Sequence, residues 1–200
     1  IGESVTTIKS DAFSGCTALQ SIVIPSGVDS IEMAVFTGCT NLQSVRLEEG
    51  ATVIGEYMFL ECTSLSNVEL PSTLTTIGNG AFKQCALETV CLPASVDSIG
   101  EYAFQNCTAL KSVELPAGLK ALSRYVFNGC TSLGSIVLPD GLETIGYSAF
   151  SNCTAMTSIT MGDKIKSVGD GAFVNCEALA DVCYKGSLSG WMRIDMLADT

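Results

Sequence analysis

The sequence predicts one elongated α/β solenoid, mainly of short β-strands, with about eight coils of 23 residues each. Two columns of residues carry this prediction, because every phenylalanine recurs at this spacing and a cysteine follows each one three places later. The phenylalanines are Phe13, Phe36, Phe59, Phe82, Phe104, Phe127, Phe150 and Phe173, and the cysteines are Cys16, Cys39, Cys62, Cys85, Cys107, Cys130, Cys153 and Cys176. One copy is too short to bury a core alone, so the copies must stack.

Each copy repeats the pattern [VL]-x-x-I-G-x-x-A-F-x-x-C-x-x-L-x-x-V-x-L-P-x-x, with one exception. At Cys85 the chain reads Cys-Ala-Leu, with one residue between the cysteine and the leucine. The other copies place two residues between the cysteine and the corresponding leucine or methionine. The copies run 5–27, 28–50, 51–73, 74–95, 96–118, 119–141, 142–164 and 165–186. The fourth unit is therefore one residue short.

Two periodicities lie side by side within each unit. The segment L-x-x-V-x-L, for example 110–115, ends in apolar and polar alternation, which predicts a short half-buried strand. The segment A-F-x-x-C-x-x-L places apolar residues three apart, which predicts a helical or 3₁₀ turn with one inward face. We expect one strand and one such turn in every coil.

Proline and glycine mark the corners of the coil. All five prolines close a strand, where a missing N–H does least damage. Glycines recur at two fixed places, for which we expect positive φ angles that turn the chain. They are Gly55, Gly78, Gly100, Gly146 and Gly169 after the second apolar cluster, and Gly27, Gly50, Gly118 and Gly141 beyond the strand.

The two ends of the chain differ from the repeat. We assign 1–186 to the solenoid and 187–200 to a C-terminal cap, in which Trp191, Met192 and Ile194 lie over the final coil. The chain opens within a repeat and shows no signal-peptide pattern. We therefore expect a piece of a longer protein or a mature chain without its original start.

Composition excludes several function classes. A net charge of −11 and a pI near 4.3 argue against binding nucleic acid or an anionic membrane surface. No apolar run approaches the roughly 18 residues of a membrane span, so we predict no membrane insertion. The chain has no histidine and no C-x-x-C, which argues against a zinc site and excludes Ser-His-Asp and Cys-His catalysis. We predict no cofactor and no enzymatic activity.

The periodic cysteines suggest either disulfides or a column of buried thiols. Coils about 4.8 Å apart fall within the range of disulfide geometry, but equivalent side chains project in parallel into the core. We therefore expect a thiol column. Cys91 and Cys183 break the period and occupy outward strand positions, where no histidine can activate them.

The pattern L-x-x-I-x-x-x-A-F-x-x-C-x-x-L-x-x-V-x-L-P resembles the BspA-like, or Treponema-type, leucine-rich repeat from Val5 to Val182. The tail with Tyr184, Gly186, Trp191 and Ile194 is similar to the unit that often ends such arrays. The resemblance implies a right-handed leucine-rich-repeat superhelix, with a parallel sheet on one side and irregular or 3₁₀ segments on the other. It also implies a secreted or cell-surface protein of host-associated bacteria or protozoa.

The outward strand positions form the candidate binding surface, on the concave side of such a superhelix. Small hydroxyl side chains dominate it, so it could equally be a merely solvated surface. Its charged residues are the candidate binding residues Arg46, Glu69, Glu88, Lys111 and Glu114. Two of them, Glu69 and Glu114, lie near the separation of an inverting glycosidase pair, but nothing else in the sequence supports hydrolysis.

A second candidate surface is formed by Tyr57, Tyr102 and Tyr125, which share one position on the flank, with Tyr147 one place off. These rings could anchor a partner or pack against neighbouring coils. The leading hypothesis is a non-enzymatic adhesion module that binds a protein, or a glycan, through the concave face. The alternative is a structural spacer within a larger surface protein.

Overall fold

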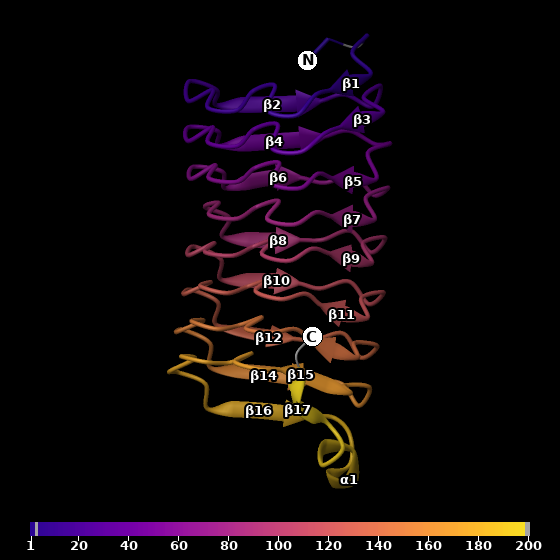
Figure 1. Cartoon of the computed structure of the whole chain (residues 1–200), viewed down its shortest axis with the longest axis vertical. Coiled ribbons are helices and arrows are strands. Elements are labelled where there is room, and N and C mark those ends of the chain that lie inside the picture. Colours follow the sequence, from indigo (N-terminus) through magenta and orange to yellow (C-terminus); the bar gives the residue numbers. More distant parts are fainter. Residues whose placement is uncertain (3, 199–200) are drawn as a thin grey trace.

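The computed structural model is a parallel-strand solenoid in which successive coils stack along one axis (Figure 1). It describes residues 1–2 and 4–198, with side chains described as far as Met196. Eight long strands, one per coil, lie side by side, and each begins 22 or 23 residues after the one before. The predicted solenoid of about eight coils is confirmed.

The long strands form one side of the stack and pair in parallel, for example Ser21 opposite Ser44 and Val45 opposite Val68. They are β2 (Ser21–Ile24), β4 (Ser44–Leu47), β6 (Asn67–Glu69), β8 (Thr89–Cys91), β10 (Ser112–Glu114), β12 (Ser135–Val137), β14 (Ser158–Met161) and β16 (Asp181–Tyr184). Their middle residue points into the core and its neighbours point outward, as the alternation predicts.

A second ladder of shorter strands lies on the other side of the coil, where irregular or 3₁₀ structure was expected. It consists of β1 (Thr7–Ile8), β3 (Ser30–Ile31), β5 (Val53–Ile54), β7 (Thr76–Ile77), β9 (Ser98–Ile99), β11 (Ala121–Leu122), β13 (Thr144–Ile145), β15 (Ser167–Gly169) and β17 (Asp195–Ala198). A β-branched Ile or Val in every one of these strands from β1 to β15 except β11, which has Leu122, favours the extended backbone there.

The core is a stack of aromatic rings beside a column of thiols. Neighbouring phenylalanine rings lie 5.3–5.6 Å apart and within 14° of parallel. From Cys39 onward, each periodic thiol donates a hydrogen bond of 3.0–3.2 Å to the phenylalanine carbonyl of the preceding coil. All ten cysteines are free, as the thiol-column interpretation requires.

The predicted helical or 3₁₀ segment is wrong. The A-F-x-x-C-x-x-L segment consists of turns, because every second N–H bonds to the next coil, as in Phe36 to Met58 O at 2.9 Å. Two residues in each coil have positive φ, which breaks any helix. They are Asp11, Ala34, Tyr57, Gly80, Tyr102, Tyr125, Ser148 and Gly171 in one column, and Gly15, Gly38, Glu61, Gln84, Asn106, Gly129, Asn152 and Asn175 in the other.

The glycine that follows the second apolar cluster has a different role from the predicted one. None of the five has positive φ, but a Cβ there would lie closer than 3.0 Å to backbone atoms of the preceding coil, as with Gly146 at 2.7 Å from Leu122 O. Glycine is required for close approach between coils. Beyond the strand, Gly50 has the expected positive φ, whereas Gly118 and Gly141 do not.

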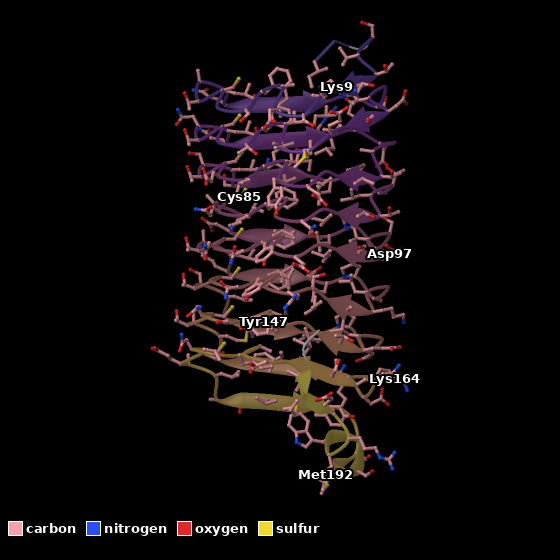
Figure 2. The ribbon with its side chains drawn as sticks, in the orientation of Figure 1. Lys9, Cys85, Asp97, Tyr147, Lys164 and Met192 are labelled. Atoms are coloured by element: carbon pink, nitrogen blue, oxygen red, sulfur yellow. The ribbon has the colours of Figure 1, made fainter. Side chains whose placement is uncertain are left out.

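The C-terminal segment covers only part of the last coil. Helix α1 (Leu188–Trp191) leads into β17, which pairs with β15 on the short-strand side. Trp191 packs against the core and Ile194 is buried, but Met192 is 77% exposed at the outer end of the molecule (Figure 2), so its predicted role is wrong. Val182 on the long-strand side stays 50% exposed. Residues 199–200 of the predicted cap lie outside the described residues.

Candidate functional site

The five candidate residues all lie on one surface, the long-strand face, which we define as the outward side chains of the long strands and of the residue before each strand. Arg46, Glu69 and Glu114 belong to β4, β6 and β10, whereas Glu88 and Lys111 directly precede β8 and β10. All five are exposed. The structure therefore brings them onto a common face, since parallel in-register pairing stacks equivalent positions.

Several of these charges are neutralised within the protein. Lys111 and Glu88 form an ion pair of 2.7 Å, which lowers the pKa of the Glu88 carboxyl. Arg46 binds Glu48 at 2.6 Å within its own coil, and this hydrogen bond lowers the pKa of Glu48. The sequence analysis missed Glu48, although it lies two residues after Arg46, because the strand ends between them and changes direction.

Glu69 and Glu114 have no ion-pair partner among the described residues. Cys91 occupies the same outward column in β8, directly opposite Glu114 in the strand register. Its thiol is free, and it is exposed, as its predicted outward position requires. An uncompensated carboxylate thus lies on each side of an accessible thiol.

The long-strand ladder is interrupted between β6 and β8, which share no pairing. In seven coils the residue three places after the periodic cysteine, a leucine in six of them and Met156 in the other, donates its N–H to that cysteine's carbonyl at 2.9–3.0 Å. Leu87, only two residues after Cys85, makes no such bond. The N–H of Glu88 also lacks the bond to the preceding coil that Ser66 and Lys111 make. The missing residue therefore removes a turn and lets β8 separate from β6.

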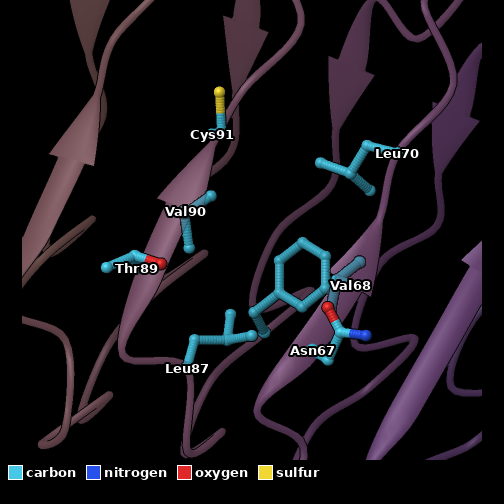
Figure 3. Close-up of a pocket in the computed structure, with 8 residues that line it drawn as sticks. Asn67, Val68, Leu70, Leu87, Thr89, Val90 and Cys91 are labelled. Carbon is cyan, nitrogen blue, oxygen red and sulfur yellow. The ribbon is translucent and has the colours of Figure 1, made fainter.

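This interruption opens a crevice of about 160 Å³ toward the core (Figure 3). Val68 and Val90 are only half-buried there, whereas their equivalents Val45 and Val113 are 1% and 8% exposed. The crevice is lined by Asn67, Val68, Leu70, Phe82, Leu87, Thr89, Val90 and Cys91. Strands β10 and β12 also lack ladder pairing, but Gly134 N–H still bonds to Lys111 O and the residue facing inward from β12, Ile136, is buried.

The flank tyrosines pack largely against one another. The rings of Tyr102 and Tyr125 stack at 4.9 Å, and Tyr147 meets Tyr125 edge-on at 5.2 Å. Lys83 and Arg124 lie over the rings of Tyr102 and Tyr147. These contacts support the packing interpretation over the partner-anchor interpretation for this cluster.

The described residues contain no cluster of three or more His, Cys, Asp or Glu side chains arranged to hold a metal ion. Within the same residues, no helix has the length and apolarity needed to cross a membrane. The long-strand face offers hydrogen-bonding groups, charges and one crevice that exposes both polar and apolar atoms.

Comparison with known proteins identifies the repeat. Residues 1–111 and 97–191 match the family described as BspA type leucine rich repeat region, in six copies. The chain belongs to this family. No curated protein matches it. The BspA-type repeat thus extends over nearly the whole stack of coils.

Solved structures of bacterial leucine-rich repeat proteins have the same fold. A leucine-rich repeat protein from Bacteroides ovatus is 25% identical, with a TM-score of 0.69 over 96% of this chain, which spans 66% of that protein. The T. pallidum leucine rich repeat protein is 30% identical, with a TM-score of 0.71 over 81% of this chain and 78% of its own. A leucine rich cell surface protein from Faecalibacterium prausnitzii is 25% identical, with a TM-score of 0.50 over 96% and 80%.

Proposed function

We propose that this BspA-type repeat is a non-enzymatic adhesion module of a secreted or cell-surface protein, and that its long-strand face binds a partner protein. The observation that carries the proposal is the exposed outward column of Arg46, Glu69, Cys91 and Glu114, in which Arg46 lies in register with Glu69 and Cys91 with Glu114. This column offers an extended polar strip instead of an enclosed catalytic pocket. The similarity to a leucine rich cell surface protein supports the location.

The charges of the face define where a partner gains most. Lys111 with Glu88 and Arg46 with Glu48 already pair within the protein, so a partner that contacts them must replace existing exposed ion pairs of small net value. Glu69 and Glu114 are available without that exchange. A partner with basic residues facing these two carboxylates is favoured.

The test is a binding screen of the purified protein against extracellular matrix proteins and a glycan panel, repeated with a Glu69→Lys/Glu114→Lys variant. We expect saturable binding to a protein that is lost in the variant, while the melting temperature stays unchanged because both side chains are exposed. A matched control, Asp97→Lys, changes an exposed carboxylate directly before β9 on the short-strand side, which has no ion-pair partner among the described residues. Binding that persists in the variant would place the partner elsewhere.

The alternative function is a structural spacer that holds other domains away from a cell surface. The continuous stack of eight phenylalanine rings favours it, because the stack runs through the whole rod without offering a contact to a partner. The self-paired surface charges favour it too, because they leave fewer free charges for a partner. A folded, monomeric protein that binds nothing in the screen would support the spacer.

A further inference from the structure

We propose that the crevice between β6 and β8 is the anchor point of the long-strand face, where it receives one apolar side chain from a basic segment of a partner protein. The inference rests on the proposed function and names its central contact. Elsewhere on the face, the outward columns consist largely of small hydroxyl and charged side chains. At this crevice, the partly buried side chains of Val68, Leu70 and Val90 come within reach of a ligand.

The volume sets the size of the anchor. A cavity of about 150 Å³ lined by Leu, Ile and Phe takes up benzene in an engineered protein. The crevice measures about 160 Å³ and is lined in large part by Val68, Leu70, Phe82, Leu87 and Val90. One phenyl ring or one branched aliphatic side chain therefore fills it. Apolar anchors in fully desolvated pockets are the contacts that dominate protein interfaces.

The interrupted ladder explains why the space stays open. Half-buried Val68 and Val90 would be covered if β6 and β8 paired, as Val45 is between β2 and β6. The Phe59 and Phe82 rings remain stacked at 5.5 Å beneath, so the coils cannot close the gap by sliding together. The crevice is thus a preformed site with a rigid floor, which lowers the ordering cost of binding.

Charge decides what surrounds the anchor. A second hollow of about 370 Å³ adjoins the crevice through Leu70 and is lined by Arg46, Glu48, Glu49 and Glu69. Glu114 follows on the other side of Cys91. Carboxylates outnumber cations around the opening, so lysine or arginine residues flanking the apolar anchor complement it.

The thiol of Cys91 at the rim gives a direct readout. The probe is the capped peptide Lys-Phe-Lys, with Lys-Ala-Lys as its matched control, and the measurement is the iodoacetamide alkylation rate of each thiol by mass spectrometry. With a Kd of about 1 mM, about 5 mM peptide slows alkylation of Cys91 about sixfold. Cys183, exposed on the same face, is the internal control and keeps its rate. Equal effects of the two peptides, or equal protection of both thiols, overturn the proposal.

Two variants close the crevice by different means. Insertion of threonine between Cys85 and Ala86 restores the 23-residue unit and the β6–β8 pairing, and Val90→Phe fills the space with a ring. Both are expected to abolish protection of Cys91 by Lys-Phe-Lys, and protection that persists in either folded variant contradicts the anchor site.

The same variants separate this inference from the proposed function. If a partner found in the screen binds the two closed-crevice variants as tightly as the original chain, the anchor site is wrong and the binding face stands. The opposite result is that the partner binds Glu69→Lys/Glu114→Lys with unchanged affinity but binds the closed-crevice variants about tenfold or more weakly. In that case the crevice is the binding site, and the proposed role of the wider face is wrong.

Discussion

Two regions of the solenoid contain the same residue types but differ in the pairing of their long strands. One is the set of coils from β2 to β6, and the other is the junction between β6 and β8. From β2 to β6 the long strands pair residue by residue, and the middle residue of the central strand, Val45, is buried. Between β6 and β8 that pairing is lost. The phenylalanine stack and the β5–β7–β9 ladder nevertheless continue, and the Cys85 thiol still donates a hydrogen bond to Phe59 O.

The difference shows that the layers of this solenoid are set separately. In the fourth unit the phenylalanine and the cysteine precede the missing residue along the chain, so their places in the core stack are unaffected. The long strand comes after it and depends on the turn between Cys85 and Leu87. One deleted residue therefore opens a single face without disturbing the rod.

The largest expected effect compares two phenylalanines of the stack. Phe127→Ala removes a fully buried ring between two regular coils and is expected to lower the free energy of unfolding by about 3–5 kcal/mol. Phe82→Ala, beside the crevice, is expected to cost less, about 3 kcal/mol, because that ring already adjoins open space. Urea unfolding measures both. A greater loss for Phe82→Ala would mean that the junction is packed as tightly as the rest.

The next effect concerns the glycines that allow coils to approach. Gly146→Ala places a Cβ 2.7 Å from Leu122 O and is expected to destabilise the protein by about 2 kcal/mol, because backbone must shift. Gly134→Ala is the matched control, since its Cβ meets nothing within 4 Å, and it should stay within about 0.5 kcal/mol. Similar melting temperatures for the two variants would contradict the close-approach explanation.

Repairing the short unit should remove the difference between the two regions. Threonine inserted after Cys85 restores the Leu87 turn and the β6–β8 hydrogen bonds, and covers Val68 and Val90. We expect a gain of about 1–2 kcal/mol in the free energy of unfolding, measured in urea. Threonine inserted after Ala117, in an exposed corner of a regular 23-residue unit, is the control and should lower stability. A loss in the repaired variant would show that the fourth unit has adapted to its length.

The sequence predicted the parts of the fold that depend on repetition. Phe104 and Cys107 are buried where the period places them, and Arg46, Glu69 and Glu114 share the expected face. It failed where the outcome depends on contacts between coils. The roles of Gly146 and Tyr57, one a close approach and the other a positive φ, are set by the neighbouring coil, which a single unit does not reveal.

An irregularity at the position of the crevice could have been predicted from the sequence. The missing residue after Cys85 is visible in the repeat, and it directly precedes the segment L-x-x-V-x-L that forms the long strand. What the repeat could not show was whether the core or the strand ladder would absorb the deletion. The rigid ring stack from Phe59 to Phe104 decides that question, since its spacing is the same on both sides of Phe82.

The smallest expected effect tests whether the thiol column continues independently of the strand ladder. Burial raises the pKa of the Cys153 thiol to about 12, whereas an unfolded cysteine titrates near 8.5. Between these values the unfolded chain loses the proton and the folded chain keeps it, so the free energy of unfolding falls as the pH rises above about 8.5. The contribution of the protonated thiol is fully present below that pH. The difference in free energy of unfolding between the original chain and Cys153→Ala should therefore shrink by about 1.4 kcal/mol per pH unit between about pH 9 and 10.

The measurement is urea unfolding under reducing conditions at about pH 8, 9 and 10, with Cys183→Ala as the control. That thiol is exposed and lies outside the thiol column. Cys62 has the same raised pKa of about 12 for the same reason and lies on the other side of the junction, one coil before Cys85. Equal narrowing of the stability gap in Cys62→Ala and Cys153→Ala would show that the thiol column is uninterrupted. If the stability difference for Cys62→Ala alone does not change with pH, solvent reaches the thiol column at the crevice. The missing residue then affects the core as well as the strand ladder.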